Sequence, residues 1–299
     1  MKYNSGAAFR QALEDRLRTS SLKSGMPLVR LRKMVAFDRF LARLFWDQSD
    51  KWIVKGGFAL QLRLGDRART TKDIDLLILE QDQQIHPVLR EVGMLDLGDW
   101  FHFEVSNRVI DDNTQDNLKD FGGTRYQIQA LLDGRTFERF HIDIGIGDPL
   151  IEPIEHLRTP DILAFAEVEP TIVPCYPVSQ QIAEKLHAYT RPYTSGQSTR
   201  VKDFVDILLL AGFGVLESEN LNKAIKATFE TRQTHMLPTS LPPVPKGWSR
   251  PYRRMVAEVG IDYSTLDQAN EALKRFLNPL LIEKTLGTWD PSTWSWTLG

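Results

Sequence analysis

Two carboxylates stand two positions apart, Asp73 and Asp75, each followed by an apolar residue. Residues two apart on a strand point to the same side. The acids would therefore share one face of a strand, while Ile74 and Leu76 would enter a core. Paired carboxylates are suitable ligands for a divalent cation such as Mg²⁺ or Mn²⁺. The spacing predicts a metal site at Asp73 and Asp75.

A glycine pair, Gly56 and Gly57, precedes this strand and leads into a predicted helix over residues 58–64. Glycine allows close approach of the backbone to a phosphate, and a helix N-terminus attracts anions. Polar side chains that could contact or screen phosphates follow: Arg67, Arg69, Thr71 and Lys72. Metal-binding acids beside a phosphate-binding turn are the parts needed for nucleotidyl or phosphoryl transfer. The simpler alternative is a glycine turn near an unrelated surface strand.

A third acid, Asp143, lies in an alternating apolar segment over residues 140–148. We predict that it joins the metal ligands and acts as general base toward an attacking hydroxyl. The alternative is an acid that caps a turn at the end of a strand.

Two further segments carry charged candidates. Lys185 lies beside the apolar face of a predicted helix over 179–189, and a lysine there could neutralise a triphosphate. Asp203 and Asp206 share one face of a predicted helix over 201–211. The ordinary alternatives are a solvated lysine and acids that interact with the helix dipole.

The periodicity of apolar residues predicts an α/β (α+β) fold. A mixed sheet flanked by helices would hold the acids. After about residue 160 the pattern becomes mainly helical, and residues 237–251, rich in proline, are expected to form a loop. Helices are predicted over 7–20, 28–46, 58–64, 179–189, 201–211, 220–234 and 267–277, and strands around 52–54, 73–79, 103–106, 124–130 and 140–148. Asp133-Gly134 is expected to form a hairpin turn after the strand over 124–130. Ser179 is expected to cap its helix, and Pro279 to stop the last one.

The composition is that of an ordinary globular protein: 299 residues, 42% hydrophobic and 25% charged, with a net charge of −2. This net charge excludes a protein that coats nucleic acid through a uniformly basic surface. The single Cys175 excludes an intrachain disulfide and a cysteine-cluster metal site. The polar N-terminus and the lack of any apolar run of about 18 residues favour a cytoplasmic protein without a membrane segment.

The order of the motifs is more specific than any one of them. Lys55-Gly56-Gly57-Phe58-Ala59-Leu60 is followed by Thr71-Lys72-Asp73-Ile74-Asp75-Leu76, then Glu184-Lys185-Leu186-His187-Ala188, then Arg200-Val201-Lys202-Asp203-Phe204-Val205-Asp206. Over roughly residues 28–210 the chain resembles the AbiEii/MenT family of nucleotidyltransferase toxins, found in bacterial abortive-infection and toxin–antitoxin systems.

The resemblance implies a metal-dependent enzyme that moves a nucleoside monophosphate from an NTP to an RNA acceptor. In some members the acceptor is the tRNA 3′ end, which blocks translation and growth, and a separately encoded antitoxin restrains the toxin. By position, Gly57 would touch the triphosphate, Asp73 and Asp75 would bind Mg²⁺ or Mn²⁺, and Lys185 would contact phosphates. Asp203 or Asp206 would complete the late acidic motif.

The change of pattern along the chain predicts two lobes that form a cleft. Residues 1–160 would be a nucleotidyltransferase lobe with N-terminal helices, and 161–299 a mainly helical lobe, although one bilobed domain is equally compatible. A basic segment could hold RNA or be a solvated loop anchored by Trp248 and Tyr252. Its basic residues are Arg232, His235, Lys246, Arg250, Arg253 and Arg254.

Two other functions remain open. The same site could transfer a nucleotide or a phosphate to a protein or small-molecule hydroxyl. The fold could also be catalytically inactive and bind nucleotide or RNA. The intact acids and Lys185 argue against an inactive fold.

Overall fold

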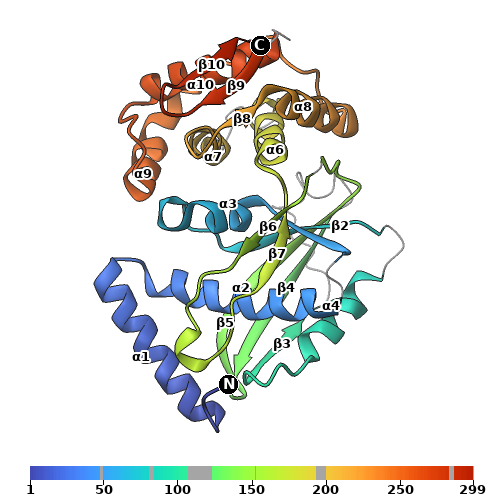
Figure 1. The fold of residues 1–299 in the computed structure, drawn as a ribbon, viewed down its shortest axis with the longest axis vertical. Helices are drawn as coiled ribbons and strands as arrows, with labels where there is room; N and C mark the ends of the chain where they lie inside the picture. Colours follow the sequence, from blue (N-terminus) through green and yellow to red (C-terminus); the bar gives the residue numbers. More distant parts are fainter. Residues whose placement is uncertain are drawn as a thin grey trace. The chain divides into compact units, whose positions relative to one another are not determined.

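The computed structural model describes residues 1–47, 50–80, 84–106, 123–151, 153–192, 200–282 and 286–298. The chain forms two compact units, coloured along the sequence in Figure 1. The first unit contains Met1–Leu62, Thr70–Gly147 and Glu155–Cys175. The second contains Arg63–Arg69, Asp148–Ile154 and Tyr176–Gly299.

A seven-stranded mixed sheet in the order β3-β4-β5-β2-β1-β7-β6 forms the centre of the first unit. The β2–β5 and β1–β7 pairs are parallel, and the other neighbours are antiparallel. The predicted mixed sheet is thus confirmed. The strands are β1 (Trp52–Lys55), β2 (Asp73–Ile78), β3 (Phe101–Val105), β4 (Thr124–Leu132), β5 (Arg135–Ile146), β6 (Glu155–Arg158) and β7 (Ile172–Cys175).

Helix α2 lies across one face of this sheet (Figure 1). Phe37 and Phe40 of α2 pack edge-on against Phe140 of β5, with ring centroids 4.9 and 6.0 Å apart. Such tilted aromatic pairs add to the free energy of burial. The helices that begin in this unit are α1 (Gly6–Ser24), α2 (Leu28–Asp47), α3 (Gly56–Leu64) and α4 (Ile85–Met94), with a short 3-10 turn at Ala164–Ala166.

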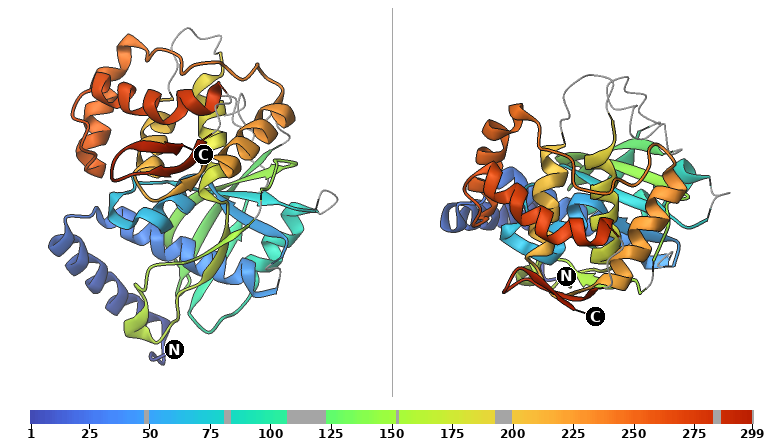
Figure 2. Two further views of the ribbon diagram at one scale, coloured as in Figure 1. Left: turned by 45° about the horizontal axis from the view of Figure 1, so that its top comes forward. Right: turned by 90° about the horizontal axis from the view of Figure 1, so that it is seen from above.

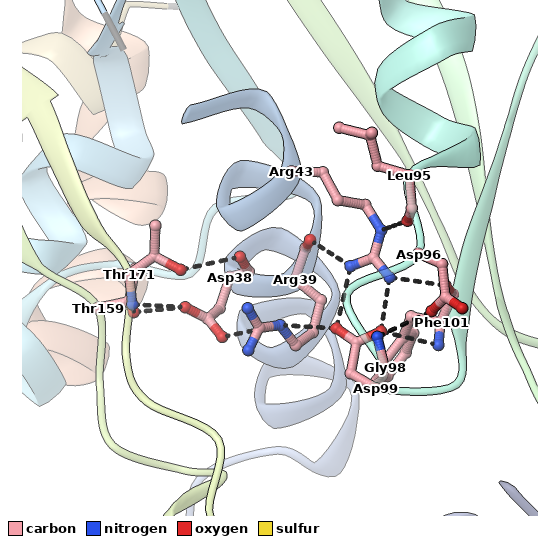
Figure 3. Close-up of polar contacts among 10 residues, drawn as sticks. All are labelled: Asp38, Arg39, Arg43, Leu95, Asp96, Gly98, Asp99, Phe101, Thr159 and Thr171. Carbon is pink, nitrogen blue, oxygen red and sulfur yellow. Dashed lines mark hydrogen bonds and ion pairs between the residues drawn. The ribbon is translucent and has the colours of Figure 1, made fainter. Parts of the chain in front are cut away.

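A buried ion network joins α2 to the segment before β3 (Figure 3). Arg43 is fully buried and donates to both carboxylate oxygens of Asp99, at 3.0 and 2.5 Å. It also donates to the carbonyls of Leu95, Arg39 and Phe101. The guanidinium therefore has many acceptors, which is the condition under which a buried charge is tolerated.

The β4–β5 hairpin turns at Asp133 and Gly134, with φ of 53° and 68°. Positive φ at both central residues is typical of the tight hairpin turn that Asp-Gly favours. The turn was predicted from the sequence, and the structure has it there. From this turn the two strands continue toward Asp143 of β5, which pairs with Asp75 of β2.

The second unit is mainly helical, as predicted. A small three-stranded sheet in the order β10-β9-β8 accompanies the helices. The elements are a 3-10 turn at Gly65–Arg67, α6 (Val178–Thr190), α7 (Val201–Ala211), β8 (Leu216–Glu217), α8 (Ser218–Arg232), a 3-10 turn at Lys246–Trp248, α9 (Ser249–Val259), α10 (Leu266–Leu281), β9 (Leu286–Asp290) and β10 (Ser295–Leu298).

Proline misled the sequence prediction twice in this unit. The expected loop over 237–251 ends in α9, because Pro251 lies in the first helical turn, where a backbone N–H has no intrahelical acceptor. Pro279 was expected to stop α10, but the helix continues to Leu281. The expected Ser179 cap of α6 is also wrong: the helix begins at Val178 after Pro177, without a side-chain cap.

The tryptophan-rich tail forms the β9–β10 hairpin, which runs beside α10 in Figure 2. Three indole N–H groups donate to helix carbonyls: Trp289 to Ala211 at 2.8 Å, and Trp294 and Trp296 to residues of α10 at 2.9 and 2.8 Å. The tail is therefore an integral part of this unit. Over the described ranges, no helix combines the length and apolarity needed to cross a membrane.

Candidate active site

Four charged residues form one row across four adjacent strands of the first unit. Lys55 of β1 pairs with Asp75 of β2, Asp75 with Asp143 of β5, and Asp143 with Arg125 of β4. Residues directly opposite on neighbouring strands have neighbouring side chains. The row therefore places two carboxylates in the centre and one cation at each end.

Asp75 carries the signature of concentrated negative charge. Burial raises its pKa, and the charges of Asp143 and Asp73 raise it further, to about 7. Lys55 and a hydrogen bond from the backbone N–H of Gly57, at 3.3 Å, act in the opposite direction. A bound cation would relieve this repulsion, so the site favours positive charge.

Gly56 makes room for that carboxylate. A Cβ at this position would lie 1.9 Å from Asp75 Oδ2, and the backbone has a φ of +63°. Helix α3 begins at Gly56, two residues earlier than predicted, so its N-terminus faces Asp75. Both glycines thus lie beside Asp75, and their contact with a phosphate stays a prediction.

Asp73 and the two residues before it, Thr71 and Lys72, differ in their contacts and exposure. The Asp73 carboxylate lies 3.4 Å from His141 Nδ1 and 4.0 Å from Arg125 Nη2. Thr71 is buried and donates its hydroxyl to the Asp73 carbonyl, at 3.2 Å. Lys72 is exposed. Nucleotide contacts by Thr71 and Lys72 stay predictions.

Arg125 is a residue that the sequence prediction missed. Its Nε and Nη2 donate to the two oxygens of Asp143, each at 2.6 Å. These hydrogen bonds raise the pKa of Arg125, so the guanidinium stays charged. Asp143, predicted as a metal ligand and general base, is held here in a bidentate ion pair.

The acids can hold a divalent cation as a pair. Among the described residues, no group of three His, Cys, Asp or Glu side chains is placed to hold a metal ion on its own. Asp73 and Asp75 nevertheless offer oxygen ligands from one face of β2. The raised pKa of Asp75 reflects the negative charge gathered there. Mg²⁺ typically takes one or two protein carboxylates and completes its shell with water and phosphate oxygens. The donor set fits such an ion.

A second polar cluster lies within the second unit. Asp206 is fully buried and accepts hydrogen bonds from Lys185 Nζ at 2.6 Å and from Arg69 Nε and Nη2, both at 2.9 Å. Burial alone would raise the pKa of Asp206, but Lys185 and Arg69 outweigh it and the pKa is lowered. The cluster is therefore ionised.

Lys185 is more buried than its helical position suggested. We expected it beside the apolar face of α6, yet it is buried. Burial lowers its pKa, while Asp206 and Asp203 raise it by more, so the pKa is raised overall. Asp203 lies 3.7 Å from Lys185 and 3.6 Å from Arg200. The structure thus unites Lys185, Asp206, Asp203 and Arg69, of which Arg69 was expected only near phosphates.

Comparison with known proteins identifies the chain. Residues 39–281 match the family model of the nucleotidyl transferase AbiEii toxin of type IV toxin–antitoxin systems. The chain belongs to the AbiEii family. The fold of this AbiEii protein is similar to that of MenT4, a nucleotidyltransferase toxin of Mycobacterium tuberculosis. The two share 17% identity, with a TM-score of 0.54 over 90% of this chain and 97% of MenT4.

JHP933 of Helicobacter pylori has 14% identity and a TM-score of 0.43, over 83% of this chain and 90% of that protein. A nucleotidyltransferase-like antigen of Paracoccidioides brasiliensis has 17% identity and a TM-score of 0.40, over 67% and 88%. A search among curated proteins found no significant match to this AbiEii chain.

The basic segment of this AbiEii protein divides into two parts. Arg232 is bound to Asp148 at 3.0 Å and to Glu184 at 2.7 Å, so its charge is used inside the second unit. Trp248 and Tyr252 are buried and anchor the segment. Exposed basic residues lie on α9: Arg250, Arg253 and Arg254.

Proposed function

We propose that this AbiEii protein transfers a nucleoside monophosphate from an NTP to an RNA acceptor, the 3′ end of tRNA. Extension of that end would block aminoacylation, and with it translation and growth. A separately encoded antitoxin would restrain the enzyme in the cytoplasm. Membership of a nucleotidyl transferase toxin family supports the reaction class.

One observation carries the proposal. Asp75 lies against Asp143 and near Asp73, faces the first turn of α3, and has a pKa raised to about 7. A site that concentrates carboxylates in this way is suited to cations that accompany a triphosphate. Asp73 and Asp75 would hold Mg²⁺ or Mn²⁺. Such an ion, when bound, stabilises negative charge on the phosphate oxygens during transfer.

The chain's own groups would position the substrates. Gly57, at the N-terminus of α3, would contact the triphosphate, together with Lys72 and Thr71. Lys185, fixed by Asp206, would contribute a positive charge toward the nucleotide. Asp143 would take the proton of the attacking hydroxyl once Arg125 has released it. Arg250, Arg253 and Arg254 would bind RNA phosphates, which makes binding salt-dependent.

The test is transfer of label. Purified protein is incubated with total tRNA, Mg²⁺ and each α-labelled NTP in turn. We expect labelled tRNA with one or two of the NTPs. Asp73→Asn and Asp75→Asn should each reduce the rate by several orders of magnitude, because a metal ion supplies several kcal/mol to the transition state. Asp161→Asn, an exposed acid of the same unit, is the matched control.

Other outcomes separate the alternatives. Label on protein would show that the acceptor is a protein hydroxyl. Label on a small molecule would favour a phosphotransferase or nucleotidyltransferase of small molecules. No transfer with any acceptor, in protein free of antitoxin, would contradict the proposal and favour a nucleotide- or RNA-binding role.

A further inference from the structure

The charges of the sheet row are arranged in an order that bears on metal binding. Arg125 and Lys55 flank the two central acids, Asp143 and Asp75. Arg125 contacts both oxygens of Asp143 at 2.6 Å, and its Nη2 also lies 4.0 Å from Asp73. The guanidinium therefore lies among the acids that would bind a metal.

We propose that Arg125 is the resident cation of this site and that its bidentate ion pair withholds Asp143 from a bound divalent metal ion. The proposal rests on the function proposed above. Arg125 is thus a positioning residue, since it acts through Asp143. Asp73 and Asp75 are the two acids available to bind a metal ion. Asp143 becomes a metal ligand or general base only when the guanidinium of Arg125 moves to another anion.

The geometry of the pair supports this assignment. A guanidinium fork satisfies one oxygen with each of two N–H groups, so both carboxylate oxygens of Asp143 are engaged at once. Arg125 and Asp143 are both largely buried, with side chains 17% and 14% exposed. Electrostatic attraction is stronger where water is largely excluded. A metal ion that recruits Asp143 must first displace this cation.

The pairing of the strands places three acids near one another. Asp75 and Asp143 are directly opposite on parallel strands, and Asp73 is on the same face of β2. The strands thus bring three acids together, and both carboxylate oxygens of the third, Asp143, accept hydrogen bonds from Arg125. An arginine can release a carboxylate for a phosphate, because both anions accept the same fork.

Metal affinity measured without nucleotide or RNA tests the proposal. Mn²⁺ binding to the full-length protein is followed by the electron paramagnetic resonance of free Mn²⁺. We expect Arg125→Gln to bind Mn²⁺ about tenfold more tightly than the native protein, because Asp143 is released. The double variant Arg125→Gln/Asp143→Asn should lose that gain. Arg139→Gln, an arginine of the neighbouring β5 that contacts Gln129, should bind as the native protein does.

A second variant covers the case in which Arg125→Gln does not fold. Arg125→Lys keeps the charge but cannot bond both oxygens, so it should show a smaller gain in the same direction. Unchanged or weaker Mn²⁺ binding in the folded arginine variants would overturn the proposal. A gain that persists in the double variant would also overturn it, because the effect would then not pass through Asp143.

The proposed reaction and the proposed role of Arg125 can fail independently of each other. If native protein labels no acceptor but Arg125→Gln gains Mn²⁺ affinity through Asp143, the proposed function fails and the role of Arg125 stands. If the native protein labels tRNA and Mn²⁺ affinity does not depend on Arg125, the role of Arg125 fails and the function stands.

Discussion

Gly56 and Asp75 are coupled at the scale of single atoms. Gly56→Ala would add a Cβ 1.9 Å from the Asp75 carboxylate at a φ of +63°. We expect loss of transferase activity and a fall in the free energy of unfolding larger than the backbone cost alone. Gly65→Ala is the control, since φ there is +57° and an added Cβ would meet no atom within 4 Å beyond its chain neighbours. It should lose only about 1–2 kcal/mol and keep its activity. Urea unfolding of both variants measures the difference, and equal losses would contradict the expected clash.

Asp206 illustrates the cost of removing one member of a buried charged cluster. Asp206→Ala would leave Lys185 and Arg69 without the carboxylate that both contact. We expect a loss of about 3–5 kcal/mol in the free energy of unfolding. Asp203→Ala, which removes a longer contact of 3.7 Å, should lose about 1 kcal/mol or less. Chemical denaturation compares the two, and a smaller loss for Asp206→Ala than for Asp203→Ala would refute this ranking.

At the scale of elements, the packing of α6 against α8 makes stability depend on pH. His187 of α6 packs edge-on against Phe229 of α8, with centroids 5.0 Å apart. Burial, together with the charges of Arg232, His235 and Arg191, lowers the pKa of His187 to about 3. The unfolded chain takes up a proton near the usual value of 6.5, but the folded chain does not. Stability should therefore fall as the pH is lowered below 6.5.

Urea unfolding between pH 7.5 and pH 5 measures this dependence. The contribution of His187 is at most about 1.4 kcal/mol per pH unit. His187→Gln should reduce the slope, whereas His156→Gln, at an exposed position of β6, should leave it unchanged. An identical slope in native protein and His187→Gln would exclude this histidine as its source.

The helices and strands that could be predicted were those with a long apolar period and simple turns. Strand β2, which carries Asp73 and Asp75, and the hairpin turn at Asp133 and Gly134 are two examples. Arg125 could not be found in this way. Counting back from the turn pairs residue 125 with 142, but an irregularity between Ala130 and Leu131 shifts the register and places Arg125 opposite Asp143. One extra residue in a strand leaves no local sequence signal that we recognised.

Burial of charged side chains was equally hard to predict. The Lys185–Asp206–Arg69 cluster joins three segments that are far apart in the sequence, so helical periodicity could not show that Lys185 is enclosed. By contrast, each motif that indicated the family is a short run of consecutive residues. The family match over residues 39–281 confirms the predicted family. The family could thus be predicted more easily than the electrostatic environment of the charged residues.

At the scale of the whole molecule, the chain passes between its two units more than once. The second unit contains Arg63–Arg69 and Asp148–Ile154, two segments that are interspersed in sequence with those of the first unit. A fragment of residues 161–299 would lack Arg69, one partner of Asp206, and Asp148, one partner of Arg232. We expect this fragment not to unfold cooperatively, because buried charges lose their partners.

Circular dichroism during heating tests the fragment, with the full chain as the control. The full chain should show a sharp transition, and the fragment a broad one with weak near-ultraviolet signal. A sharp transition in the fragment would show that the late residues fold without the two early segments.

The indole groups of the β9–β10 hairpin make the end of the chain optically informative. Trp289 is fully buried, and its ring lies 5.2 Å from Trp294 and 5.4 Å from Trp296. Indole emission shifts to longer wavelength when water reaches the ring, and neighbouring indoles exchange excitation. Release of this hairpin from α7 and α10 would therefore change both the colour and the polarisation of fluorescence. The protein carries its own spectroscopic reporter for the integrity of its second unit, with no label added.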